Sequence, residues 1–137
     1  MSSIHEFKAR SMVRMATEAR SRAYVPYSNF RVGACLKANN GAYYMGANIE
    51  NAAYSPTVCA ERCAVLRAVY EGERGFDALA IIWDGENYAV PCGVCRQVLS
   101  EFCEPDMPVV CANRAGEFKI LTLGELLPES FGARDMQ

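Results

Sequence analysis

The sequence has a single histidine, no excess of positive charge and no apolar run long enough to cross a membrane. Its formal net charge is -2 and its pI is near 5.4, with lysines and arginines scattered along the chain, which disfavours a nucleic-acid partner. Residues 2–22 are dotted with charges and contain no apolar signal core. We therefore expect a soluble, cytoplasmic protein that acts on a small molecule and binds neither nucleic acids nor membranes.

The cysteines do not form the pattern of a small secreted protein. There are seven, an odd number, and they lack the dense, regular spacing of a disulfide scaffold. Reduced thiols and metal binding are the more consistent interpretation. The 137 residues, 51% of them hydrophobic, fit one compact domain over residues 1–137.

The hydrophobic pattern predicts alternating helices and strands. An amphipathic helix is expected from Ile4 to about Ala23, and residues 30–49 predict a hairpin around the turn at residues 39–41. The other expected elements are a helix over 59–71, a strand over 79–83, a helix over 92–102, strands over 108–111 and 118–121, and a short helix over 123–127. This order predicts an α/β fold in which a mixed sheet is covered by helices on both faces.

The most informative motif is Cys59-Ala60-Glu61 followed by Pro91-Cys92-Gly93-Val94-Cys95. It supplies three thiolates for one zinc ion and a carboxylate beside them. A structural zinc is normally enclosed by four protein ligands, whereas a catalytic zinc keeps one position open, so this set favours hydrolytic chemistry. A glutamate near a zinc ligand, followed by Pro-Cys-x-x-Cys, is the signature of zinc-dependent nucleobase deaminases.

The expected helices bring these ligands together. Cys59 and Cys92 stand at the starts of two helices, with Cys95 one turn further on, so both N-termini can converge on one ion. Three thiolates around a divalent zinc leave a net negative cluster, which two helix dipoles and a local cation would offset. Arg62 is the candidate cation, because its guanidinium could donate a hydrogen bond to a ligating sulfur.

Together with three further segments, these motifs resemble the small zinc-dependent cytidine deaminases, specifically the homotetrameric type with three cysteine ligands. The further segments are residues 26–34 and 48–55, the continuation of the second motif through residues 96–98, and the C-terminal Leu126-Leu127-Pro128 with Phe131. The resemblance covers nearly the whole chain. It implies a three-layer αβα fold with a sheet of about five strands, one Zn²⁺ per subunit, and a homotetramer with active sites completed across subunits.

The resemblance also implies a reaction, the hydrolytic deamination of cytidine and deoxycytidine to uridine and deoxyuridine in pyrimidine salvage. A zinc-bound hydroxide would attack C4 of the pyrimidine. Glu61 would act as the proton shuttle, first taking a proton from the water and then delivering protons to N3 and to the departing ammonia.

Further residues match the positions that hold the substrate. Asn48 and Glu50 match a pair that holds the sugar, and Glu50 can accept a hydrogen bond from a ribose hydroxyl. Phe30 matches an aromatic residue lining the pyrimidine pocket, and Ala60 would offer its backbone N–H to the base carbonyl. Phe131 matches an aromatic residue contributed across the subunit boundary. These matches favour a nucleoside over a free base.

Two alternative functions fit part of the sequence. Trp83 and residues 84–90 are less typical of the family and lead into the Pro91 loop, so they bear on the preference among cytosine nucleosides. The alternative enzyme is a deaminase of a modified cytosine or of a cytosine-containing antibiotic nucleoside. The alternative of a different class is a structural zinc or thiol-redox module, because Cys-x-x-Cys alone occurs in both. Such a module gives no reason for an acid beside Cys59.

The other notable side chains are interpreted as structural. Cys63 lies one turn from Cys59, and packing is a commoner role for a buried free cysteine than a fourth ligand. Three more cysteines are expected in the core: Cys35, Cys103 and Cys111. His5 is expected at the surface, and Arg31 and Arg96 are interpreted as surface or interface charges.

Overall fold

Five strands form one sheet in the computed structural model, which describes residues 4–136. In chain order they are β1 (Val32–Ala38), β2 (Tyr43–Ala47), β3 (Phe76–Trp83), β4 (Pro108–Ala112) and β5 (Phe118–Thr122). Their spatial order is β2-β1-β3-β4-β5. β3 and β4 are parallel and the other neighbouring pairs are antiparallel, so the sheet is mixed, as the sequence predicts.

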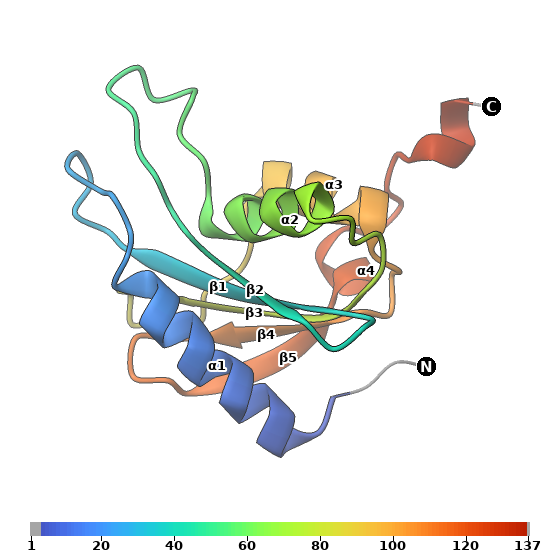
Figure 1. Ribbon diagram of the computed structural model, residues 1–137, viewed down its shortest axis with the longest axis horizontal. Helices are drawn as coiled ribbons and strands as arrows, with labels where there is room; N and C mark the ends of the chain where they lie inside the picture. The colour runs from blue at the N-terminus through green and yellow to red at the C-terminus, as the bar shows by residue number, and fades with distance from the viewer. Residues whose placement is uncertain (1–3, 137) are drawn as a thin grey trace.

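Helices cover both faces of this sheet (Figure 1). They are α1 (Glu6–Arg20), α2 (Ala60–Tyr70), α3 (Gly93–Phe102) and α4 (Leu123–Leu126), followed by a short 3-10 helix, η1 (Ala133–Met136). Figure 1 shows α1 on one face and α2, α3 and α4 on the other. The expected three-layer αβα architecture is therefore confirmed.

The core consists of two apolar clusters, one on each face of the sheet. Neighbouring residues of β1 point to opposite faces, so Leu36 joins the cluster under α2 and α3, whereas Cys35 joins the cluster under α1. Leu99 of α3 and Met12 of α1 are fully buried in these two clusters. A sheet buried on both faces explains why its central strands are almost continuously apolar.

The expected boundaries differ most at the end of α1, which stops at Arg20 and not near Ala23, and at the start of β3. Strand β3 begins at Phe76, whereas the apolar run predicts a start at Leu79. Asp77 interrupts the run, but its carboxylate accepts a hydrogen bond from Lys37 of the neighbouring strand at 2.7 Å. The strand therefore continues through a charged position that the apolar pattern alone treats as a loop.

A glycine allows α2 to lie very close to the sheet. A Cβ atom on Gly46 of β2 would stand 2.4 Å from the carbonyl oxygen of Ala60 and 2.6 Å from the backbone nitrogen of Ala64. Only glycine leaves room for such an approach of two backbones. This contact fixes the first turn of α2, which begins beside Cys59, against β2.

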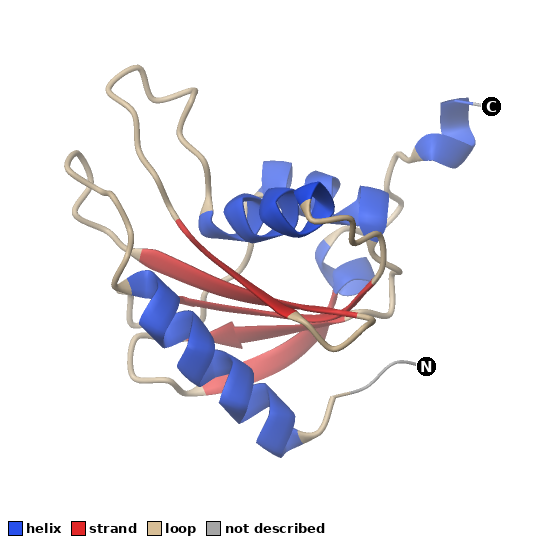
Figure 2. Cartoon of the chain, viewed as in Figure 1, coloured by secondary structure: helices blue, strands red, loops and turns tan. Residues whose placement is uncertain are grey.

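Two long loops, residues 21–31 and 48–59, project beyond the sheet (Figure 2). They are joined through Ile49, which pairs with Tyr24 on one side and with Val58 on the other. The second loop leads directly into the N-terminal end of α2, where the cysteine motif begins (Figure 1). The loops therefore bring residues from two parts of the chain to the same end of the sheet.

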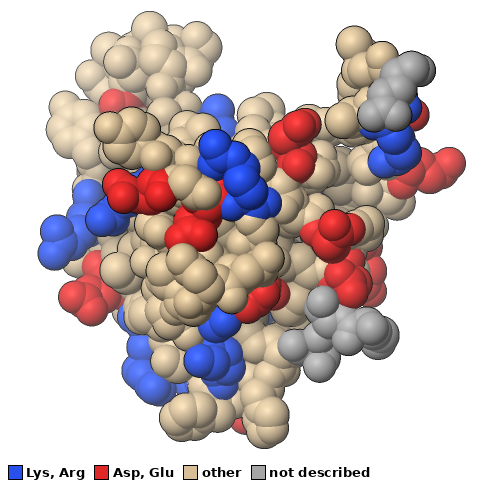
Figure 3. All heavy atoms as spheres, turned by 45° about the vertical axis from the view of Figure 1, so that its right-hand side comes forward, with Lys and Arg blue, Asp and Glu red and all other residues tan. Residues whose placement is uncertain are grey.

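The surface shows no gathering of positive charge on the face in Figure 3. Lys and Arg side chains lie there among Asp and Glu side chains. This distribution agrees with the scattered charges of the sequence. None of the helices formed by residues 4–136 is long and apolar enough to cross a membrane.

Candidate zinc and catalytic site

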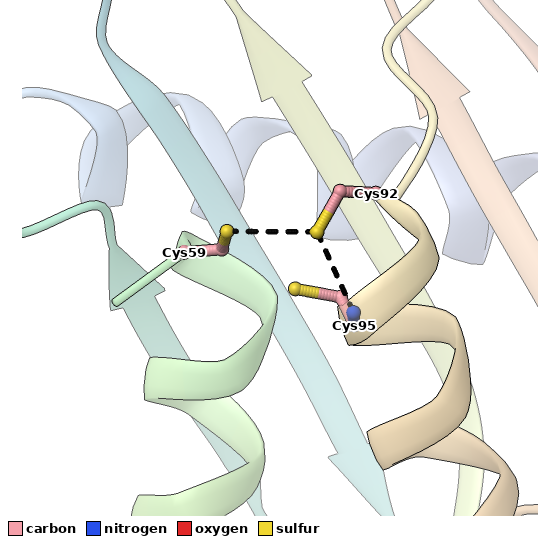
Figure 4. Close-up of side chains that lie close together, drawn as sticks. All are labelled: Cys59, Cys92 and Cys95. Atoms are coloured by element: carbon pink, nitrogen blue, oxygen red, sulfur yellow. Dashed lines mark hydrogen bonds between the residues drawn. The ribbon is translucent and has the colours of Figure 1, made fainter. Parts of the chain in front are cut away.

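Cys59, Cys92 and Cys95 meet at the beginnings of two helices. Cys59 is the N-cap residue of α2, Cys92 is the N-cap residue of α3, and Cys95 lies in the first turn of α3. Figure 4 shows their sulfur atoms gathered in the space between the two helices. The Cys59 and Cys92 sulfurs are 3.7 Å apart, and all three sulfurs lie within 4.8 Å of one another.

The spacing of these sulfurs fits a zinc ion. Tetrahedral ligands at about 2.3 Å from zinc lie about 3.8 Å from one another, close to the separation of Cys59 and Cys92. Both helices direct the positive ends of their dipoles at the cluster, which favours thiolates over thiols. Three sulfurs leave one tetrahedral position for a water molecule or substrate, as in a catalytic zinc site.

The electrostatics of the thiols also favour a cation. The neighbouring Cys95 thiol, with hydrogen bonds from Arg62 and Cys92, lowers the pKa of Cys59 to about 5. The proximity of Cys59, together with burial, raises the pKa of Cys95. A divalent cation held between the sulfurs would favour their deprotonated forms.

Glu61 lies on the first turn of α2 with its side chain directed into the protein. Only 3% of the residue is exposed, and this burial raises the pKa of the carboxyl group to about 7. A carboxyl group with such a pKa can both accept and return a proton near neutral pH. The neighbouring Ala60 is fully buried. It is the first residue of α2, so its backbone N–H has no hydrogen-bond acceptor within the helix.

Arg62 reaches back from α2 to the cysteine cluster. Its guanidinium donates to the Cys59 sulfur at 3.5 Å and to the carbonyl oxygen of Thr57 at 3.1 Å. The bond to Thr57 holds the guanidinium beside the sulfur. A positive charge is thus fixed next to the Cys59 sulfur, where it would offset part of the negative charge of three thiolates.

Asn48 and Phe30 lie on the two projecting loops and are hydrogen-bonded to each other. The side-chain nitrogen of Asn48 donates to the carbonyl oxygen of Phe30 at 2.9 Å, and its side-chain oxygen accepts from the N–H of Val32 at 2.9 Å. Asn48 therefore determines where the Phe30 backbone lies. Each half of its amide keeps one further hydrogen-bonding position for a ligand.

Glu50 is held by the turn that precedes Phe30. One carboxylate oxygen accepts the N–H groups of Tyr27 and Ser28, both at 3.1 Å, and the other accepts the Ser28 hydroxyl. The Ser28 bonds lower the pKa of Glu50, so the group is a carboxylate at neutral pH. It lines an open hollow of about 450 Å³ together with Tyr54 and Thr57.

Comparison with known proteins gives one consistent family. Residues 7–111 match the family model for the cytidine and deoxycytidylate deaminase zinc-binding region. The cytidine deaminase of Sporosarcina psychrophila is 49% identical over 91% of this chain and 92% of its own length. That of Halalkalibacterium halodurans is 46% identical over 91% and 95%. The chain belongs to the cytidine deaminase family.

Solved structures support the same assignment. The crystal structure of cytidine deaminase from Burkholderia pseudomallei superimposes with a TM-score of 0.87 at 39% identity and covers 93% of this chain and 100% of that chain. The cytidine deaminase of Mycobacterium tuberculosis gives 0.80 at 34% identity, over 94% and 99%. The cytidine deaminase fold is therefore confirmed over nearly the whole chain. Together with the three convergent cysteines, the zinc-binding family identifies one Zn²⁺ as the cofactor.

Phe131 matches an aromatic residue that cytidine deaminases contribute across the subunit boundary. It lies between α4 and η1. Its side chain is 59% exposed, and its carbonyl oxygen accepts a hydrogen bond from Gln97 of α3 at 3.0 Å. Directly after it, η1 projects away from the body of the subunit (Figure 1). Phe131 is therefore not buried with the cysteine cluster of its own chain.

Arg96 links two segments of the chain by hydrogen bonds, a structural role that the sequence did not indicate. It is half-buried and donates to the carbonyl oxygen of Pro91 at 2.6 Å and to that of Leu126 at 2.7 Å. The interpretation as a surface or interface charge did not include these two bonds. Arg96 joins the loop before Cys92 to the end of α4, two segments far apart in the chain.

The remaining cysteines and the histidine lie where they were expected. Cys63 is half-buried and stands outside the group of three convergent sulfurs. The core cysteines are fully or almost fully buried: Cys35, Cys103 and Cys111. His5 is exposed.

Sequence reasoning missed two residues beside Phe30. The Trp83 ring contacts the Phe30 ring edge-to-face, with centroids 5.6 Å apart. Asp84 accepts hydrogen bonds from the backbone N–H and the guanidinium of Arg31 at 2.9 to 3.2 Å. The only signal was that Trp83 and the segment after it are less typical of cytidine deaminases. Their contact with the Phe30 loop depends on the pairing of β1 with β3.

Proposed function

We propose that this protein hydrolyses cytidine and deoxycytidine to uridine and deoxyuridine, releasing ammonia, in pyrimidine salvage. The observation that carries the proposal is the position of Glu61, a buried carboxyl group directly beside three convergent thiols. A structural zinc or thiol-redox module has no use for such an acid. Cytidine deaminases similar over nine-tenths of this chain support the substrate assignment.

In this proposal Cys59, Cys92 and Cys95 hold the zinc ion. When bound, zinc supplies Lewis acidity that makes water nucleophilic near neutral pH. Glu61 accepts a proton from the attacking water and passes it to N3 of the ring. It then takes the remaining proton from the new hydroxyl group on C4 and passes it to the departing amino group, so that C4 becomes a carbonyl and ammonia leaves. The pKa of Glu61, about 7, suits both transfers. Arg62 holds the Cys59 sulfur and offsets the negative charge of the ligands.

The substrate is held by residues of the projecting loops. Glu50 accepts a ribose hydroxyl, and because it is already fixed by the N–H groups of Tyr27 and Ser28, little side-chain entropy is lost on binding. Asn48 uses its remaining amide positions for the sugar. The Phe30 ring packs against the pyrimidine, and the Ala60 N–H donates to the base carbonyl.

We also infer that the protein is a cytoplasmic homotetramer in which subunits complete each other's active sites. The exposed ring of Phe131 and the projecting η1 support this inference, because both point to a contact outside their own subunit. Gln97 fixes the backbone of Phe131 to α3, and α3 carries Cys95. Each subunit would thus present Phe131 to a neighbour in a defined position.

The test compares zinc-loaded protein with its Glu61→Gln variant. We expect loss of cytidine absorbance and formation of uridine by the unchanged protein, and a decrease in kcat of about 100-fold or more in the variant. The zinc content of both, measured by atomic emission, should be equal. Failure of zinc-loaded protein to turn over either cytidine or deoxycytidine would overturn the substrate assignment. Modified cytosine nucleosides would then be assayed.

A further inference from the structure

We propose that Trp83 is a positioning residue for the substrate base, which acts by holding the Phe30 ring at its place in the pyrimidine pocket. This inference rests on the proposed function, because it takes Phe30 to pack against the pyrimidine. It assigns part of the affinity for the base to a side chain at the end of β3, outside the cysteine motifs and both projecting loops.

The first observation is the contact between the two rings. Phe30 and Trp83 meet edge-to-face, with an interplanar angle of 68° and centroids 5.6 Å apart. This is a favourable geometry for an aromatic pair. The Phe30 residue is 38% exposed, so the indole restrains a ring that otherwise stands partly in solvent.

The second observation is that Trp83 is itself firmly held. Its indole N–H donates to the carbonyl oxygen of Asn87 at 2.7 Å, and its carbonyl oxygen accepts from the Arg20 guanidinium at 2.8 Å. Its backbone lies opposite Val32 in the pairing of β3 with β1. Both the indole and the backbone of Trp83 are therefore held in place. The indole can thus restrain the more exposed ring of Phe30.

The backbone after Phe30 is attached to the same end of β3. Asp84 accepts from the N–H of Arg31 at 2.9 Å, and its own N–H donates to the Arg31 carbonyl oxygen at 3.1 Å. On the other side, Asn48 donates to the carbonyl oxygen of Phe30. The backbone at Phe30 is therefore fixed on two sides, and Trp83 supports the ring.

Gly85 provides an independent way to disturb this pair. A Cβ atom at Gly85 would stand 3.0 Å from Nε1 of Trp83 and 3.4 Å from Cζ of Phe30. The first distance is too short for an undisturbed indole. Gly85→Ala would therefore displace the indole by a few tenths of an ångström without removing either ring.

The main experiment is a double-mutant cycle on Phe30 and Trp83, using zinc-loaded protein and cytidine. We expect Trp83→Ala to raise KM about 3- to 10-fold, the range of an aromatic pair, and to leave kcat within about 2-fold. In a Phe30→Ala background the same substitution should leave KM unchanged, because the ring that Trp83 supports is absent. Phe7→Ala, which removes a 74% exposed ring from α1, is the matched control and should not change KM.

The nature of the substrate gives a second readout. The Trp83→Ala effect should be equal for cytidine and deoxycytidine, because the indole acts on the base and not on the sugar. Gly85→Ala should also raise KM, by less than Trp83→Ala because the indole is shifted and not removed, so the proposal stays testable if Trp83→Ala does not fold. An additive effect of Trp83→Ala in the Phe30→Ala background, or a fall in kcat alone, would overturn it.

Binding can also be followed without turnover, since Trp83 is the only tryptophan of the chain. Saturation with uridine, the expected product, should change its fluorescence, and Phe30→Ala should remove that change at saturating uridine. Unchanged emission in a protein that uridine inhibits competitively would contradict a link from Trp83 to the base. If the unchanged protein neither turns over cytidine nor binds uridine, the proposed function itself fails.

Discussion

At the scale of single residues, the first turn of α2 separates two charges that are adjacent in the chain. Glu61 points into the protein and is almost fully buried, whereas Arg62 turns back to the Cys59 sulfur. Successive residues of a helix point about 100° apart, so one turn can supply both an acid and a cation to different sides of the cluster. This explains how three consecutive residues, Ala60 included, can have three different roles in one site.

The charge of Arg62 makes a testable difference to pH dependence. Burial dominates the pKa of Glu61 and raises it, and the charge of Arg62 lowers it by a smaller amount, so removal of Arg62 should raise that pKa further. Glu61 would then become protonated at higher pH, and the acidic limb of kcat/KM should move up by about 0.5 to 1 pH unit in Arg62→Gln, with zinc retained. The measurement is the pH-rate profile on cytidine. Arg62→Lys keeps the charge and should shift the limb less.

Residues that are close in the chain could be assigned from the sequence, whereas residues brought together by the sheet could not. Cys59, Glu61 and Arg62 lie within one helical turn, so their proximity follows from helix geometry alone. Arg96 and Trp83 have no such local signal. Their partners at Leu126 and Phe30 come from other elements, and the contacts exist only once those elements are packed.

At the scale of elements, the close contact of β2 with α2 positions the turn that carries Cys59 and Glu61. Gly46→Ala would bring a methyl group within 2.6 Å of the backbone of α2, which cannot move away without displacing Cys59 and Glu61. We expect a loss of about 1 to 3 kcal/mol of unfolding free energy, together with weaker zinc binding. Urea denaturation and chelator competition measure the two effects.

A second glycine supplies the control for this substitution. A Cβ atom at Gly93, in the first turn of α3, would meet no atom within 4 Å. Gly93→Ala should therefore leave the unfolding free energy unchanged or raise it slightly, because alanine favours helix more than glycine does. If both variants lose the same stability, close packing of α2 on β2 is not the cause.

The sequence predicted the elements better than their spatial order. Alternation of apolar helices and strands indicated a mixed sheet between two helical layers, and the glycine and asparagine turn indicated the hairpin of β1 and β2. The central position of β1, between β2 and β3, depends on long-range pairing that no local pattern encodes. The start of β3 could not be predicted for a similar reason. Asp77 is accommodated in the strand by Lys37, which lies on another strand.

At the scale of the whole molecule, one subunit brings together all the proposed site residues except Phe131. The cysteines, Glu61 and the loop residues gather at one end of the sheet, whereas Phe131 remains exposed beside the projecting η1. A larger hollow, of about 570 Å³, lies at the other end of the sheet, near Lys37 and Phe76, and contains none of the proposed site residues. In the proposed oligomer, the active sites would depend on how copies of the chain meet around Phe131.

Complementation between two defective subunits tests this dependence. Glu61→Gln removes the acid from its own site, and Phe131→Ala removes the ring that the subunit would give to its neighbour, with an expected loss of about 10-fold in kcat/KM. A mixed site with Glu61 from one subunit and Phe131 from the other would be complete. With equal amounts and random assembly, about a quarter of the sites should regain full activity.

The two variants should be co-expressed with different affinity tags, so that only mixed oligomers are purified through both tags. Activity above the mean of the two parental oligomers would show that Phe131 acts across a subunit boundary. If Phe131 serves the site of its own chain, every site in the mixture carries one defect, and activity stays at that mean. A monomer in sedimentation velocity would contradict the shared site directly, because no second subunit would be present to supply the ring.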